Sequence, residues 1–153
     1  MSLTSKTLLG TTSNSWNYTS DPVSTSGWYG RTSGKQTVSF TMLRFVGRIY
    51  LEGTLESNPD DDSMWIPLKL DGEDYLEFEG ELEERNINGV LRFVPTGFSG
   101  TKYFNIEGNF TYLRVRIYRD YINPDGPPTG QQGYWSPVDL EYGYVTDGFL
   151  NWL

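Results

Sequence analysis

The chain has 153 residues, of which 12 are Lys or Arg and 20 are Asp or Glu, so its formal net charge is -8. It contains no Cys and no His, which excludes disulfides, thiolate metal sites and the side chain that most often serves acid–base catalysis near neutral pH. The negative charge argues against nucleic acid and against an anionic membrane as partners, because both attract basic surfaces.

The composition favours strands over helices. Aromatic residues make up 16% of the chain, and 17 Gly and 8 Pro separate short runs that are rich in Thr and Val, a pattern typical of strands joined by tight turns. The length suits one domain. No segment approaches the roughly 18 apolar residues of a membrane-spanning helix, and the first residues lack the apolar core of a secretory signal, so we expect neither a membrane anchor nor secretion.

Residues 1–35 are polar, with a few large aromatic side chains. The segment is either an extended N-terminal arm or an edge strand followed by a long loop; we take it as an arm and loop that precede a sandwich domain at 36–153. Aromatic side chains in so polar a segment indicate that part of it docks, on this domain or on a neighbouring subunit. We predict that four residues make intersubunit contacts: Trp16, Tyr18, Trp28 and Tyr29. We also predict that the sandwich folds without the arm.

Two alternating runs predict the central strands. One runs from Gln36, and the next, from Arg48, turns Ile49 and Leu51 inward while Arg48 and Tyr50 face outward. An acidic turn follows at 58–63. Its three adjacent Asp residues lack the ligand spacing of a calcium loop, so we predict a solvated turn.

Trp65 follows the acidic turn directly. We place it in the core beside Ile49, Leu51, Leu113 and Val115, because its indole is the largest apolar group of the central strands. In the alternative, Trp65 is an exposed stacking platform for a sugar.

Asp71-Gly72 and Asn88-Gly89 are strong hairpin-turn signals. Between them, alternate positions carry carboxylates, which we interpret as a solvated strand face. A cation site or a catalytic pair is the functional alternative. These carboxylates belong to Glu77, Glu79, Glu81 and Glu83.

Residues 101–119 hold the second strong alternation, with Leu113 and Val115 inward and with Arg114 and Arg116 outward between two tyrosines. Such arginines can stack on a ligand or a partner. Residues 123–137 have the Pro and Gly density of a long irregular loop, in which Tyr134 and Trp135 are candidates for contact. Residues 140–153 read as a terminal strand.

Many short strands with frequent turn signals predict an all-β fold, a single antiparallel β-sandwich with jelly-roll-like or immunoglobulin-like connectivity. No motif for nucleophilic catalysis, phosphate binding or metal binding is present. We therefore predict a chain that is not an enzyme, with no catalytic, cofactor-binding or metal-binding residues.

Three blocks of the sequence resemble a known family: GRIYLEGTLESNPDDDSMWIPL, GNFTYLRVRIYRDYI and EYGYVTDGFLNWL. The family is the small virion structural proteins of contractile-tailed bacteriophages, particularly marine and cyanobacterial ones, and the resemblance covers residues 36–153. Asp147-Gly148 departs from the continuous closing strand of that family, which predicts a bulge or turn there.

The resemblance implies a non-enzymatic virion component at the capsid surface, the neck or the tail, assembled in the host cytoplasm. Its partners are then other virion proteins, and we expect a homo-oligomer or assembly within the particle. We predict that the outward face with Arg48, Tyr50, Arg114 and Arg116 contacts protein rather than nucleic acid. A carbohydrate-binding module stays open as the alternative, with a glycan as ligand, because sandwich lectins also expose Tyr and Trp beside acidic and amide side chains.

Overall fold

The structure is a computed structural model that describes residues 4–12, 16–25, 35–60, 64–87, 89–122 and 142–152. The described residues form β-strands and no α-helix, which confirms the predicted all-β class. The strands are β1 (Thr4–Leu9), β2 (Tyr18–Thr19), β3 (Val23–Ser24), β4 (Lys35–Phe45), β5 (Gly47–Thr54), β6 (Ile66–Pro67), β7 (Leu76–Phe78), β8 (Glu81–Ile87), β9 (Val90–Thr96), β10 (Phe98–Glu107), β11 (Tyr112–Tyr118) and β12 (Tyr144–Trp152).

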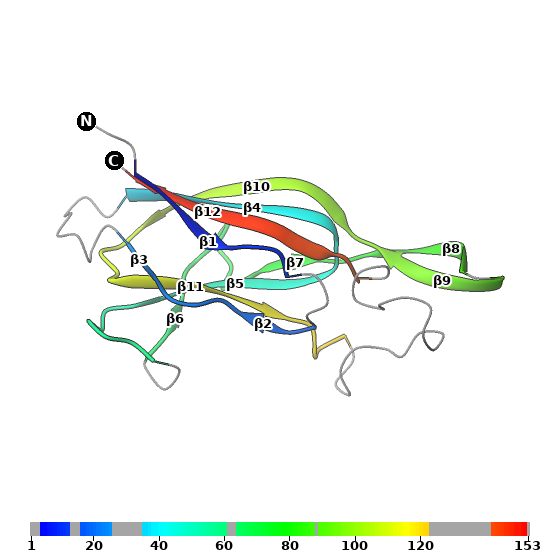
Figure 1. Ribbon diagram of the computed structural model, residues 1–153, viewed down its shortest axis with the longest axis horizontal. Coiled ribbons are helices and arrows are strands. Elements are labelled where there is room, and N and C mark those ends of the chain that lie inside the picture. The colour runs from blue at the N-terminus through cyan, green and yellow to red at the C-terminus, as the bar shows by residue number, and fades with distance from the viewer. Residues whose placement is uncertain are drawn as a thin grey trace.

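Two antiparallel sheets pack face to face (Figure 1). Sheet A has the strand order β1-β12-β4-β10. Sheet B has the order β2-β11-β5-β6, with β3 also on β11 and β7 also on β5. The predicted β-sandwich is therefore confirmed.

The connectivity is that of a jelly roll. The chain passes from β1 in sheet A to β2 and β3 in sheet B, returns through β4, and crosses again to β5. After β6 and β7 it re-enters sheet A as β10, crosses to β11 and closes as β12. Apart from β5 and β6, no two hydrogen-bonded neighbours among the described strands of these two sheets are consecutive along the chain. An immunoglobulin-like sandwich instead keeps several hairpins within each sheet, so the strand order distinguishes the jelly roll from that alternative.

The core lies between the sheets and follows the predicted alternation. Buried side chains project inward from every second position of β4, β5 and β11, as a half-buried strand requires. Leu55, whose parity matches that of Ile49 and Leu51, is nevertheless 68% exposed because β5 ends at Thr54. The buried hydrophobic residues of these three strands are Val38, Phe40, Met42, Phe45, Ile49, Leu51, Leu113, Val115 and Ile117.

The described part of residues 1–35 belongs to the sandwich, which corrects the arm prediction. β1 is an edge strand of sheet A, and Leu8 and Leu9 are buried in the core. Trp16 is only 7% exposed, and its indole Nε1 donates to Asp120 Oδ1 at 3.0 Å. The polar residues of the segment either lie at exposed positions of β1, as Ser5 and Thr7 do, or are buried and hydrogen-bonded, as Thr12 and Ser20 are. Polarity therefore did not signal a free arm. Deleting the segment would remove core side chains.

The turn and bulge signals were right. Leu70 and Glu73 exchange backbone hydrogen bonds of 2.8 and 3.1 Å around Asp71-Gly72, whose two φ angles are both positive. The register of β12 on β4 shifts between Val145 and Asp147, so the strand has a bulge directly before the predicted position, Asp147-Gly148.

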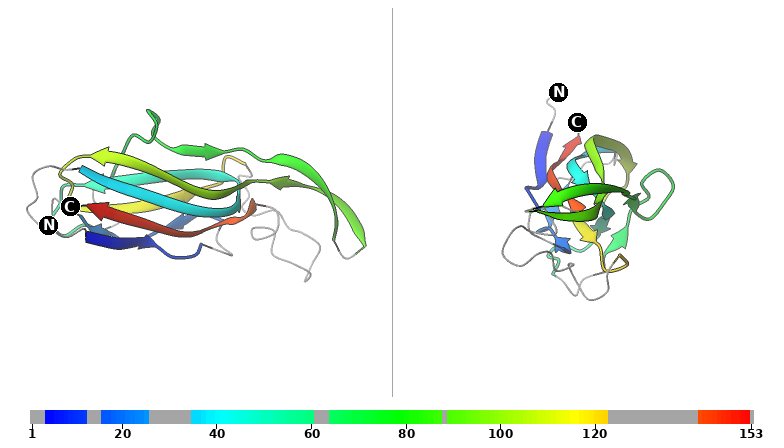
Figure 2. Two further views of the ribbon diagram at one scale, coloured as in Figure 1. Left: turned by 90° about the horizontal axis from the view of Figure 1, so that it is seen from above. Right: turned by 90° about the vertical axis from the view of Figure 1, so that its right-hand side faces the viewer.

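Strands β8 and β9 form the hairpin predicted at Asn88-Gly89. Along the chain, β8 follows β7 and β9 leads into β10. The two strands make a two-stranded ribbon that projects beyond one end of the sandwich (Figure 2).

Among the residues that the structure describes, Arg119 is the largest fully buried side chain. Its Nε donates to the carbonyl oxygen of Val46 at 2.7 Å, and its Nη2 donates to those of Tyr142 and Gly143 at 3.1 and 2.8 Å. Its guanidinium also lies 4.7 Å from the ring centroid of Phe45. One side chain therefore joins the end of β11 to the β4–β5 corner and to the start of β12.

Replacing Arg119 with Met should destabilise the fold by about 3 kcal/mol or more, because several buried carbonyl groups lose their donor. Arg119→Lys keeps the charge but lacks the planar guanidinium group that reaches several carbonyls, so its stability should lie between those of the Met variant and the parent. Urea unfolding midpoints of the three proteins give the comparison. A Met variant as stable as the parent would contradict the role of Arg119 as a structural link.

Candidate functional site: an arginine–aromatic face

The outward side chains of β5 and β11 meet on the outer face of sheet B. The strand register sets Arg114 opposite Glu52, Arg116 opposite Tyr50 and Tyr118 opposite Arg48. The four residues predicted to share a contact face, Arg48, Tyr50, Arg114 and Arg116, are therefore brought together. With the neighbours described below, we call this surface the arginine–aromatic face: Arg48, Tyr50, Glu52, Trp65, Tyr75, Glu77, Arg114, Arg116, Tyr118 and Tyr121.

Arg48 lies between two aromatic rings. Its guanidinium carbon is 4.4 Å from the ring centroid of Tyr75 and 4.1 Å from that of Tyr121, distances at which cation–π attraction operates. Its Nε donates to Glu77 Oε1 at 2.9 Å. Burial lowers the pKa of Arg48. Hydrogen bonds to Glu77 and Tyr50, together with the negative charge of Glu77, raise that pKa by more than burial lowers it, so the net shift is upward. The guanidinium therefore stays charged and fixed in place.

Glu52 holds the other two arginines. Its side chain is buried, and its two oxygens accept from Arg114 Nε at 2.9 Å and from Arg116 Nε at 3.3 Å. Arg116 also lies 4.1 Å from the ring centroid of Tyr50, and Arg114 lies 4.3 Å from that of Trp65. Each of the three arginines thus has both a carboxylate and an aromatic ring as neighbours.

Trp65 is not in the core, which corrects the sequence-based placement. It precedes β6 and is partly exposed, its Nε1 donates to the carbonyl oxygen of Asp60 at 3.0 Å, and Arg114 stacks on its ring. The register of β6 on β5 sets Pro67 opposite the outward Glu52, so Trp65, two residues earlier, has the same outward parity. The alternative, an exposed stacking platform, describes its position better, and the ring's observed neighbour is an arginine.

The other predicted contact residues lie apart from this face. Trp16 is buried, and Tyr18 is half-buried and packs against the core. Neither offers the free aromatic surface expected for an intersubunit contact. Four further candidates lie outside the described residues: Trp28, Tyr29, Tyr134 and Trp135.

Several residues of the face were missed. Glu52 has the outward parity of Arg48 and Tyr50, which was a usable signal. Glu77 was assigned to a solvated face, whereas it pairs with Arg48 because β7 adds to the edge of β5. Tyr75 and Tyr121 lie just outside strands, so alternation could not place them.

The chemistry of the face is recognition by stacking and charge. Its three arginines and two glutamates leave a local excess of one positive charge. Across the described part of the chain, no group of three or more Asp and Glu side chains is arranged to hold a metal ion. Asp61 and Asp62 of the acidic turn lie outside that part. Within the same residues, no helix has the length and apolar character needed to cross a membrane.

No protein-family model, curated protein or solved structure matches this chain. The resemblance to phage virion proteins therefore gains no support from these comparisons.

Glu52→Gln should lower the free energy of unfolding by about 2 to 3 kcal/mol, because a buried carboxylate that holds two arginines is lost. Glu77→Gln is the matched control: its side chain is 30% exposed and is paired with Arg48, so its loss should cost less than about 1 kcal/mol. Urea unfolding at neutral pH measures both. Equal costs would show that Glu52 does not organise the face.

Burial, together with the Glu77 carboxylate, raises the pKa of Tyr121 from 10.0 to about 12. Because the folded protein favours the neutral phenol, this contribution to stability is complete below pH 10 and is lost as the pH rises through 12. Tyrosinate absorbance is titrated for the parent and for Tyr121→Phe, and the difference between the two curves isolates this group from the other ten of the 11 tyrosines. A difference curve centred near pH 10 would contradict the burial of this phenol.

Proposed function

We propose that this chain is a non-enzymatic structural protein of a bacteriophage virion that acts by protein–protein contact through the arginine–aromatic face. The observation that carries the proposal is the set of three outward arginines, each beside an aromatic ring and each held by Glu52 or Glu77. The virion setting comes from the sequence resemblance.

The composition of the face suits a protein partner. Arg, Tyr and Trp are the residue types most enriched where binding energy concentrates in protein interfaces. Stacking and ion pairing hold the arginines in place before a partner arrives, which reduces the entropy lost on binding. Two carboxylates within the face offset most of its positive charge, so a nucleic-acid backbone would gain little there.

The projecting ribbon also supports assembly. In the described residues, β8 and β9 pair only with each other, so each leaves an unpaired backbone edge outside the sandwich. An isolated two-stranded ribbon is marginally stable in water, and an unpaired edge is a template for another strand. A neighbouring copy or another virion protein would stabilise this element.

Incorporation into phage particles tests the proposal. Tyr75→Ala and Arg116→Lys each remove a stacking contact, and the Lys variant keeps the charge. With the variants supplied during infection, their abundance in purified particles, measured by mass spectrometry, should fall at least about tenfold, as for residues that dominate an interface. Cross-linking of the same particles identifies the neighbour at the capsid, neck or tail.

Tyr103→Ala, an exposed tyrosine on the opposite sheet, is the matched control and should be incorporated like the parent. Absence of the parent chain from purified particles would refute the virion assignment. Unchanged incorporation of both face variants would refute the contact role of the face.

A further inference from the structure

The outer face of sheet A carries a second arrangement, with none of the arginines of the first face. One row of outward residues crosses all four strands in register: Thr7 of β1, Phe149 of β12, Ser39 of β4 and Tyr103 of β10. The row beside it consists of Ser5, Asn151, Thr37 and Asn105. Two aromatic rings thus stand in a field of hydroxyl and amide groups.

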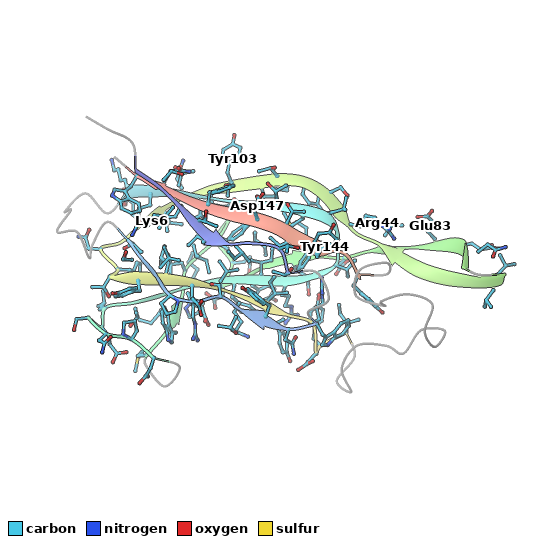
Figure 3. All side chains as sticks on the ribbon, in the orientation of Figure 1. Lys6, Arg44, Glu83, Tyr103, Tyr144 and Asp147 are labelled. Atoms are coloured by element: carbon cyan, nitrogen blue, oxygen red, sulfur yellow. The ribbon has the colours of Figure 1, made fainter. Side chains whose placement is uncertain are left out.

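Both rings are open to solvent. Tyr103 is 72% exposed and Phe149 is 38% exposed, and Figure 3 shows Tyr103 pointing away from the sandwich. They are on β10 and β12, which flank β4, so two inter-strand spacings set them about 10 Å apart. Such a separation suits rings that stack on alternate sugar units of a chain lying across the strands.

The polar groups around the rings are held in place. Thr37 Oγ1 donates to Asn105 Oδ1 at 2.8 Å, and the hydroxyls of Thr41 and Thr101 are 2.9 Å apart. These cross-strand bonds fix side chains of β4 and β10 on the outer face of sheet A. Hydroxyl and amide groups beside an exposed ring match the hydroxyls and the apolar C–H faces of a pyranose.

Charge narrows the class of ligand. The two rows contain no charged residue. At outward positions on either side of these rows, Lys35 lies opposite Glu107 and Asp147 lies opposite Thr41. An anionic polymer would find no row of cations here. A protein partner would meet few of the Arg and Trp side chains that concentrate binding energy.

We propose that the outer face of sheet A binds an uncharged glycan chain, with Tyr103 and Phe149 stacking on two of its sugar units. This site is separate from the arginine–aromatic face, and it does not depend on the virion assignment. It gives the chain a carbohydrate-binding activity through residues other than Trp65.

Affinity electrophoresis tests the proposal with the full chain. Native gels contain soluble starch, dextran, galactomannan or xyloglucan as uncharged probes, and alginate as the polyanionic probe. At least one uncharged polysaccharide should retard the parent protein, and alginate should not. Tyr103→Ala and Phe149→Ala should each weaken that retardation at least about fivefold, consistent with the loss of one stacking contact. Phe149→Tyr keeps an aromatic ring, so this variant should be retarded like the parent.

Tyr112→Ala is the matched control, because it removes a partly exposed tyrosine from β11 of the opposite sheet and should leave retardation unchanged. Near-ultraviolet circular dichroism checks that every variant is folded. No retardation by any uncharged probe, retardation by alginate alone, or an equal loss in Tyr112→Ala would overturn the proposal. So would self-association that is abolished by Tyr103→Ala in a protein that binds no glycan, because the face would then join two copies of the chain.

Discussion

The buried guanidinium of Arg119 is the interaction on which the sandwich depends, because it lies where four segments of the chain meet. Its donors reach the β4–β5 corner and the residues before β12, and its own backbone N–H donates to Asn17 Oδ1. The approach is so close that a Cβ at Gly47 would lie 2.9 Å from Arg119 Cγ. A Cβ at Gly143 would meet the Leu43 carbonyl oxygen at 2.2 Å. Glycine is therefore required where the segments converge.

This corner determines what the two outer faces display. β4 enters it in sheet A and β5 leaves it in sheet B, so the alternation of each strand turns its apolar residues toward a shared core. The remaining residues face solvent on opposite sides. On β5 and β11 they are arginine, tyrosine and glutamate, whereas on β4, β10 and β12 they are mainly Ser, Thr and Asn with two exposed rings. The β4–β5 corner thus separates a charged, stacked surface from one whose central rows carry no charge.

The alternation in sequence predicted the inner and outer positions of β4, β5 and β11, because side-chain direction in a strand depends on local parity alone. The same parity found Arg48, Tyr50, Arg114 and Arg116 as one face. Trp65 and Trp16 were misplaced because they were judged by side-chain size and by the polarity of the segment, whereas the burial of a side chain beside a turn depends on which strand it meets in space. Arg119 was missed for a similar reason: nothing local marks a charged residue whose donors serve three distant carbonyl oxygens.

The two outer faces are structurally separate because no residue belongs to both and because the packed sheets of a sandwich are about 10 Å apart. Substitutions at that separation without shared partners have nearly additive effects. An outer side chain of sheet A can therefore be replaced without moving Glu52 or the arginines that it holds. The core between the sheets is close-packed, so it transmits the loss of a buried side chain but not that of an exposed ring. The two proposals are therefore compatible in one small sandwich, because a protein partner on the stacked arginines and a glycan on the opposite sheet would contact different residues.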